Sequence, residues 1–168
     1  RVLPFGRLRV VLPELAGGMP ESPLFTLDAP VEFEVPLALG FPERGSLLIE
    51  GEATVAAATI QEVVLRLLAN HPPGRVDFTL IDPVGLGKDF AGLMHLADYE
   101  EALIHGRIWT QPAQIEERLA ELNEHLEKVI QSYLRDEYAT LDDYNAQAGG
   151  IAEKHRFVVI AGFPAGFS

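Results

Sequence analysis

The chain contains no cysteine. Disulfide bonds, thiolate metal ligands and a cysteine nucleophile are therefore excluded. Five histidines are present, but none of them follows an H-x-x-x-H or HExxH spacing, which argues against a zinc site. A chain without cysteine needs no oxidising compartment for folding, and we therefore expect a cytoplasmic protein.

Long apolar runs are also missing. No stretch reaches the roughly 18 consecutive apolar residues that identify a membrane-spanning helix, so no membrane insertion is expected. Residues 1–11 are interrupted by arginine and proline and do not fit the pattern of a signal peptide. The sequence begins with Arg1 rather than methionine, which favours a domain taken from a longer chain.

Positive charge is scarce. The formal net charge is −12, and the only lysines, Lys88, Lys128 and Lys154, lie far apart in the sequence. Nucleic acid binding needs clustered lysine and arginine to replace the counterions of the phosphates. The composition therefore argues against direct nucleic acid binding by this domain.

The rest of the composition is that of a globular protein. Hydrophobic residues make up 48% and charged residues 23% of the 168 positions, enough for one domain with a sizeable core. We expect a single domain over residues 1–168. Within it, a β-rich segment (1–45) with many prolines and glycines leads into a core of alternating strands and helices (46–168).

Hydrophobic periodicity predicts the elements of this core. Short apolar runs predict strands, helical spacing predicts helices, and the order strand–helix–strand implies parallel pairing. The predicted fold class is a three-layer α/β domain with a mostly parallel sheet. Strands are expected at 8–12, 31–39, 46–50, 76–81, 107–110 and 157–160, and helices at 55–69, 85–96, 100–104, 112–133 and 141–148. Within the strand expected at 31–39, the period-two alternation of residues 31–35 predicts one buried and one solvated face.

A strand, a glycine and a helix in this order are the setting of a phosphate-binding loop. The template needs a glycine, four residues, and then glycine, lysine and serine or threonine. Starting from Gly51, these last positions fall on Ala56, Ala57 and Ala58. Thr59 offers the nearest hydroxyl, one position late. Lysine and the Mg²⁺-binding hydroxyl are thus missing, which leaves only a degenerate nucleotide-binding position.

A second element of ATPase chemistry is also missing. The apolar strand at 157–160 is followed by Ala161 and Gly162, where acidic residues would orient Mg²⁺ and water. Asp82 ends the strand at 76–81, at the edge of a parallel sheet where ligands usually bind. It is a candidate crevice acid, or else a turn or helix-capping residue. No catalytic residue and no metal ligand is assigned.

The order of these segments resembles the FtsK/SpoIIIE-type P-loop ATPases. The similarity covers roughly residues 36–164, with Val84 where the family usually has lysine and with Phe163 and Pro164 retained after the missing acids. The segments that carry it are 36–40 (PLALG), 45–51 (GSLLIEG), 80–85 (LIDPVG), 93–96 (LMHL), the long helix from Pro112, 143–145 (DYN) and 157–164 (FVVIAGFP).

This resemblance implies a P-loop NTPase-like (RecA-like) domain that lacks the family's last strands and helix. It implies a degenerate module, structural or regulatory, in a translocase or secretion assembly, with little or no hydrolysis and no cofactor. Its expected partner is another protein, a neighbouring ATPase domain, or a second copy of the chain. The alternative is an active motor that uses ATP and Mg²⁺ to move DNA or protein.

Two further expectations follow from the residues themselves. The long helix at 115–133 is the candidate docking face, provided that Leu119, Leu122 and Leu126 are not buried in the domain's own core. A third hypothesis for function is an unrelated α/β enzyme whose site lies near Asp82.

Overall fold

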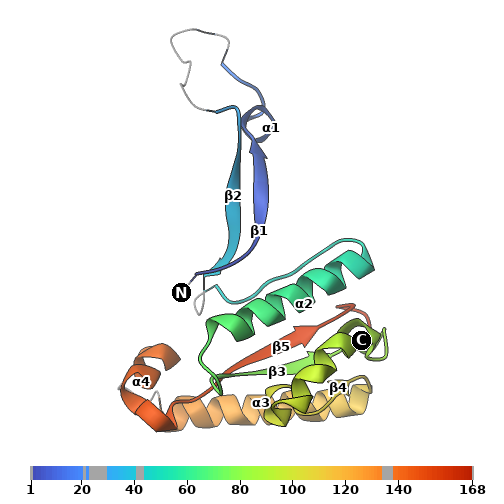
Figure 1. The fold of residues 1–168 in the computed structure, drawn as a ribbon, viewed down its shortest axis with the longest axis vertical. Coiled ribbons are helices and arrows are strands. Elements are labelled where there is room, and N and C mark those ends of the chain that lie inside the picture. Colours follow the sequence, from blue (N-terminus) through green and yellow to red (C-terminus); the bar gives the residue numbers. More distant parts are fainter. Residues whose placement is uncertain (1, 21, 23–29, 41–43, 134–137, 168) are drawn as a thin grey trace. The chain divides into compact units, whose positions relative to one another are not determined.

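A computed structural model describes residues 2–20, 22, 30–40, 44–133 and 138–167 (Figure 1). The chain divides into two compact units, Arg1–Leu48 and Ile49–Ser168. Within the described ranges, no helix is both long and apolar enough to cross a membrane.

The first unit is a β-hairpin with a short helix at its turn end. Strand β1 (Val2–Val11) pairs antiparallel with β2 (Glu32–Gly40), and helix α1 (Leu12–Ala16) follows β1 directly. One side of the hairpin is charged: Arg7 pairs with Glu34 at 3.2 Å, and Arg9 pairs with Glu32. The strand predictions at 8–12 and 31–39 are confirmed in type, although β1 begins earlier and ends at Val11.

The prediction of a buried face for 31–39 is wrong. Phe33 and Leu37 are each 37% exposed, and among the described residues of the two strands only Leu3 and Leu39 are buried. The period-two pattern does separate apolar from charged side chains. A two-stranded hairpin has no second layer of its own, however, and therefore cannot bury its apolar face by itself.

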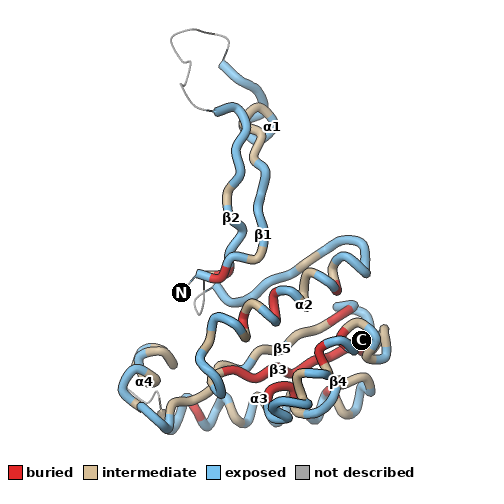
Figure 2. Tube along the Cα trace, viewed as in Figure 1, coloured by how far each residue is buried: buried red, intermediate tan, exposed pale blue. Residues whose placement is uncertain are grey.

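The second unit is built on a three-stranded parallel sheet with the order β4-β3-β5. Central strand β3 (Val76–Ile81) is buried at all six positions, seen as the red strand in Figure 2. Strands β4 (Ile108–Trp109) and β5 (His155–Ile160) flank it. The expected α/β class with parallel pairing is therefore confirmed for this unit.

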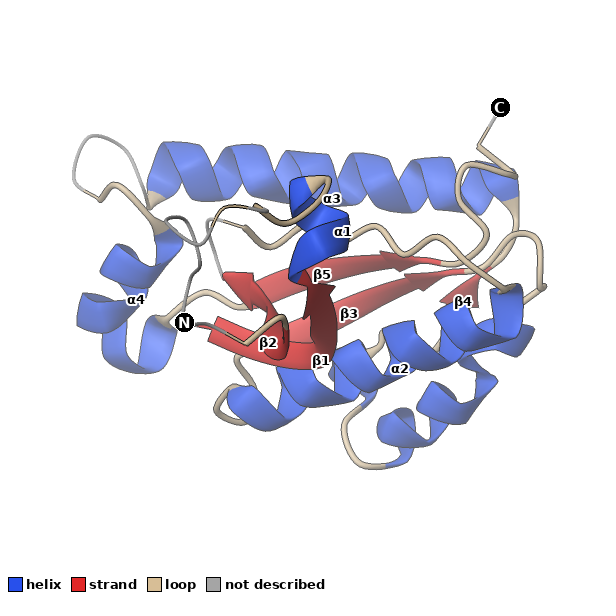
Figure 3. Cartoon of the chain, turned by 90° about the horizontal axis from the view of Figure 1, so that it is seen from above, coloured by secondary structure: helices blue, strands red, loops and turns tan. Residues whose placement is uncertain are grey.

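Helices cover both faces of the sheet (Figure 3). Helix α3 (Pro112–Ser132) lies on the face to which Thr79 points, because Arg118 of α3 bonds the Thr79 hydroxyl. Side chains alternate along a strand, so Phe78 points to the other face, where α2 (Ala53–Asn70) packs. The 3₁₀ helices η2 (Lys88–Asp98) and η3 (Glu101–Leu103) follow β3 in the chain.

The helix ends follow from local sequence. Proline occupies the first turn of α3, where its missing N–H costs nothing. Helix α4 (Leu141–Ala148) begins with a capping box in which Thr140 and Asp143 bond each other's backbone N–H. It runs into the 3₁₀ turn η4 (Gly149–Ile151). The helices predicted at 112–133 and 141–148 are confirmed, and the helix predicted at 55–69 is α2 with wider bounds.

The strand predicted at 46–50 is wrong. Residues 45–50 form no regular element, and Leu47 and Leu48 are 40% and 67% exposed. A strand exists only where a neighbouring strand accepts and donates its backbone hydrogen bonds, and this apolar run pairs with none of the described strands. The helix that follows Gly51 therefore lacks the strand that a phosphate-binding loop requires.

Candidate functional site

The N-terminus of α2 is closed by the chain's own carboxylate. Glu52 is the N-cap residue, and its side chain accepts hydrogen bonds from the backbone N–H groups of Thr54 and Val55, each at 3.1 Å, and from the Thr54 hydroxyl. These N–H groups are the ones that a helix offers to a bound anion. In this helix they already have a negatively charged acceptor.

Four of the five residues expected at the degenerate nucleotide-binding position lie on the first turns of the same helix. Ala57 is buried, whereas Ala58 is exposed and Ala56 is intermediate. The Thr59 hydroxyl donates to the Val55 carbonyl at 2.8 Å, a bond within the helix. Gly51 stands just before the cap and is exposed, with open space where a Cβ would lie.

Hydrogen bonding also sets the protonation of this cap. The Thr54 hydroxyl, followed by the N–H groups of Thr54 and Val55, lowers the pKa of the Glu52 carboxyl below its ordinary value. The carboxylate therefore stays charged over a wider pH range than a free glutamate.

Neutralising this cap should change the pH dependence of unfolding. Because the folded-state pKa of Glu52 is lowered, the stability contributed by its charge is present above the ordinary glutamate pKa and is lost as the pH falls through the folded value. We expect Glu52→Gln to have a lower Tm than the wild type at neutral pH, and the two Tm values to converge in acid. Thermal unfolding of both proteins across this range, with the exposed Glu50→Gln as control, measures the effect. A Tm difference independent of pH would contradict it.

Asp82 lies at the carboxyl end of β3, fully buried. Its carboxylate accepts backbone N–H bonds from Gly85 (2.7 Å), Gly87 (3.0 Å) and Asp89 (3.1 Å). Gly85 and Gly87 lie in the turn that follows β3, and Asp89 lies in the first turn of η2. In the structure Asp82 thus organises this turn, which corresponds to the capping alternative rather than to an acid free to meet a ligand.

The loops after β3 and β5 close on each other at this edge of the sheet. A Cβ added to Gly162 would lie 3.1 Å from Val84, and one added to Gly166 would lie 2.7 Å from Pro83. Both glycines also have positive φ angles, 72° and 84°, which side chains rarely tolerate. Ala161 is buried. The two residues that follow β5 directly, Ala161 and Gly162, carry no acidic side chain.

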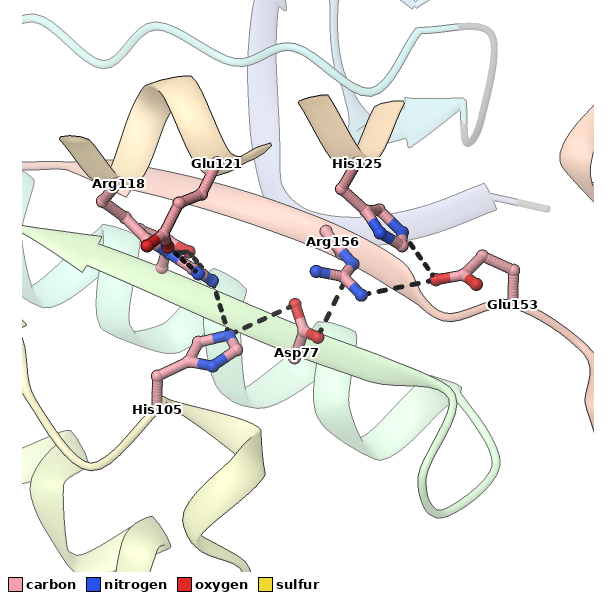
Figure 4. A network of polar contacts seen from close by, with 8 residues as sticks. Asp77, His105, Arg118, Glu121, His125, Glu153 and Arg156 are labelled. Atoms are coloured by element: carbon pink, nitrogen blue, oxygen red, sulfur yellow. Dashed lines mark hydrogen bonds and ion pairs between the residues drawn. The ribbon is translucent and has the colours of Figure 1, made fainter. Parts of the chain in front are cut away.

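A polar cluster lies on the face of the sheet that α3 covers (Figure 4). Its centre is Asp77 of β3, whose side chain is only 4% exposed. Asp77 Oδ1 lies 3.7 Å from His105 Nε2, and Oδ2 lies 4.0 Å from Arg156 Nε on β5. Arg118 of α3 completes the inner part, with Nη2 at 3.0 Å from the same His105 nitrogen.

Further hydrogen bonds and ion pairs connect Arg118 and Arg156 to neighbouring side chains. Arg118 also donates to Glu121 at 3.1 Å and to the Thr79 hydroxyl at 3.3 and 3.4 Å. On the other side, Glu153 lies 3.0 Å from His125 and 3.5 Å from Arg156. The cluster joins α3, β3 and β5 by charged side chains where apolar packing is the usual link.

Burial and the positive charges of Arg118 and Arg156 lower the pKa of His105. Burial first, and then the Arg118 guanidinium, lower the pKa of His105, while the Asp77 carboxylate opposes them. The neutral ring is thus favoured. Chemically, the centre can gain or lose a proton at His105; in the described ranges, no group of three or more histidine and carboxylate side chains could hold a metal ion.

The sequence interpretation missed this cluster, since its members are dispersed over the chain. Two signals point to it in retrospect. Asp77 and Thr79 are the polar residues of an otherwise apolar strand and have the same parity, which places them on one face. Arg118 lies beside Ile115 and Leu119 on the apolar stripe of its helix, where a buried cation needs partners.

No family model, no curated protein and no solved structure matches this chain. Its function must therefore be inferred from its own residues and their geometry.

Proposed function

We propose that this chain is a degenerate P-loop-like domain of the FtsK/SpoIIIE type that does not hydrolyse ATP and acts as a structural or regulatory module of a larger cytoplasmic assembly. The observation that carries the proposal is the Glu52 cap on α2. A phosphate group placed at this helix end would have to displace a carboxylate from Thr54 and Val55 and would be repelled by it.

The neighbouring positions support the same conclusion. A lysine that reaches the phosphates would have to stand at Ala57, which is 9% exposed and belongs to the packed face of the helix. A hydroxyl for Mg²⁺ would have to come from Ala58 or Thr59, and the Thr59 hydroxyl is bonded within the helix. Neither a lysine for the phosphates nor a hydroxyl for Mg²⁺ is therefore available at this position.

The carboxyl edge of the sheet supports it independently. Asp82 is occupied by three backbone N–H groups, and Ala161 and Gly162 stand where the family has acids. Losing both the phosphate-binding and the water-activating element removes the chemistry while leaving the α/β scaffold.

A module without chemistry acts through contacts with a partner. On α3, Leu126 and Ile130 are 54% and 49% exposed, while Leu119 and Leu122 are intermediate. Leu119, Leu122 and Leu126 are thus not fully buried, and the exposure of the C-terminal half of α3 supports its use as a docking face. A neighbouring ATPase domain or another protein is the partner that this role requires.

Titration calorimetry with ATP and Mg²⁺ tests the proposal. We expect no binding heat up to millimolar ATP, and no ATP turnover with or without DNA, from protein that unfolds cooperatively in a thermal scan of the same sample. Micromolar binding would contradict the proposal and favour the active translocase. Binding without turnover would show that the helix end still accepts phosphate and would also contradict the role assigned to Glu52.

A further inference from the structure

His105 holds one ring nitrogen between a cation and an anion. Its Nε2 lies 3.0 Å from Arg118 Nη2 and 3.7 Å from Asp77 Oδ1. Arginine only donates hydrogen bonds and carboxylate only accepts them. A single nitrogen can therefore serve just one of these partners at a time.

The structure has the arrangement of the neutral ring. With the proton on Nδ1, Nε2 accepts from Arg118, and Asp77 Oδ1 is left buried without a hydrogen-bond donor in the described part of the chain. A buried carboxylate oxygen without a donor is costly. The Arg156 side chain, 4.0 Å from the other oxygen, supplies charge but no hydrogen bond at that distance.

We propose that His105 is a proton-operated switch between α3 and β3: the neutral ring binds Arg118, and the protonated ring donates Nε2–H to Asp77 and releases Arg118. One proton enters from solvent at Nε2, one hydrogen bond breaks and another forms. This inference does not depend on the proposed function.

Charged groups from every neighbouring element set the pH of the change. Asp77 on β3 favours the protonated ring. Two more carboxylates are near: Glu121 on α3 accepts a hydrogen bond from Arg118, and the Glu101 carboxylate of η3 lies 3.2 Å from the position of a Cβ on Gly106, the residue after His105. Arg118 and Arg156 oppose protonation of the ring. Because burial and Arg118 dominate in lowering the pKa of His105, the switch should operate below the ordinary histidine value of about 6.5.

Releasing Arg118 changes the surroundings of Trp109. The Arg118 guanidinium carbon lies 5.8 Å from the Trp109 ring centre, and that of Arg107 lies 4.2 Å from it. Repelled by a protonated His105, Arg118 retains Glu121 and Thr79 as partners and shifts toward the exposed Glu121. Trp109 is the only tryptophan of the chain, so its fluorescence reports on this region alone.

Tryptophan fluorescence followed from pH 8 to pH 5 tests the switch. We expect a reversible transition in the wild type with its midpoint below 6.5, and loss of the transition in His105→Asn. Asparagine suits this position because His105 has a φ of +55°, which asparagine tolerates. His95→Asn is the matched control: His95 is exposed, pairs with Asp98 and should leave the transition unchanged. A wild type without a transition, or a transition that persists in His105→Asn, would overturn the proposal.

A second measurement needs no variant. Nitrogen-15 NMR of the wild-type imidazoles should show His105 with its proton on Nδ1 at neutral pH, and should show both nitrogens protonated once the fluorescence has changed. A proton on Nε2 at neutral pH, or titration at or above 6.5, would refute the switch even if His105→Asn failed to fold.

Discussion

Replacing Asp82 with alanine is expected to lower the free energy of unfolding by about 3 to 5 kcal/mol, since it leaves three backbone N–H groups without their acceptor. The donors, on Gly85, Gly87 and Asp89, all bond this one buried carboxylate. A loss of this size is a large fraction of the stability of a typical domain.

Urea unfolding followed by circular dichroism measures the change. Asp98→Ala is the matched control, because the Asp98 side chain is 73% exposed and pairs with the exposed His95 at the surface; it should change stability by less than about 0.5 kcal/mol. Asp82→Asn should fall between the two, since it keeps one acceptor oxygen but turns an N–H₂ group toward a backbone donor. A cost below about 1 kcal/mol for Asp82→Ala would mean that water replaces the carboxylate in this turn.

Local sequence patterns predicted the parts of the fold that depend on local physics. Strand β3 is a six-residue run ended by Asp82 and Pro83, and α3 shows apolar residues at every third or fourth position after Pro112. Capping and periodicity act within a few residues, so they are visible in the sequence. The helix α4 was predicted with its observed bounds for the same reason.

Pairing and burial are not local, and there the sequence was misleading. Leu47, Leu48 and Ile49 have the composition of a buried strand, but composition does not provide a neighbouring strand. The hairpin β1–β2 shows the same limit: its alternation is real, yet Phe33 and Leu37 remain partly exposed. An apolar pattern predicts that a face should be covered, and it does not identify what covers it.

The candidate site includes features that the sequence shows directly and others that only the folded structure shows. The missing lysine and hydroxyl at Ala57 and Ala58 could be seen directly in the sequence, whereas the Glu52 cap could not be distinguished from any exposed glutamate. The centre formed by Asp77, His105 and Arg118 is assembled from β3, the loop after η3 and α3. Its residues are separated by 28 and 13 positions in the chain, and only the packing of α3 on the sheet brings them together.

Gly85→Ala is expected to destabilise the second unit by about 2 to 3 kcal/mol, as overpacking of a well-packed site does. A Cβ at this position would lie 2.6 Å and 2.8 Å from the two Asp82 oxygens, closer than unbonded carbon and oxygen atoms approach. The carboxylate cannot move away without losing the N–H groups that hold it. The turn therefore requires glycine at position 85 because the Asp82 carboxylate is held in place by its hydrogen bonds.

A double-mutant cycle separates this explanation from a general intolerance of alanine. In an Asp82→Ala background the clashing oxygens are gone, so Gly85→Ala should cost less than about 1 kcal/mol, giving a coupling of about 2 kcal/mol. All four proteins can be compared by urea unfolding with a stabilising osmolyte that keeps the weakest variant folded. Gly150→Ala, where a Cβ would meet nothing within 4 Å, is the control. Equal costs of Gly85→Ala in both backgrounds would show that the glycine is required for another reason, and that the Asp82 carboxylate does not set the shape of the turn.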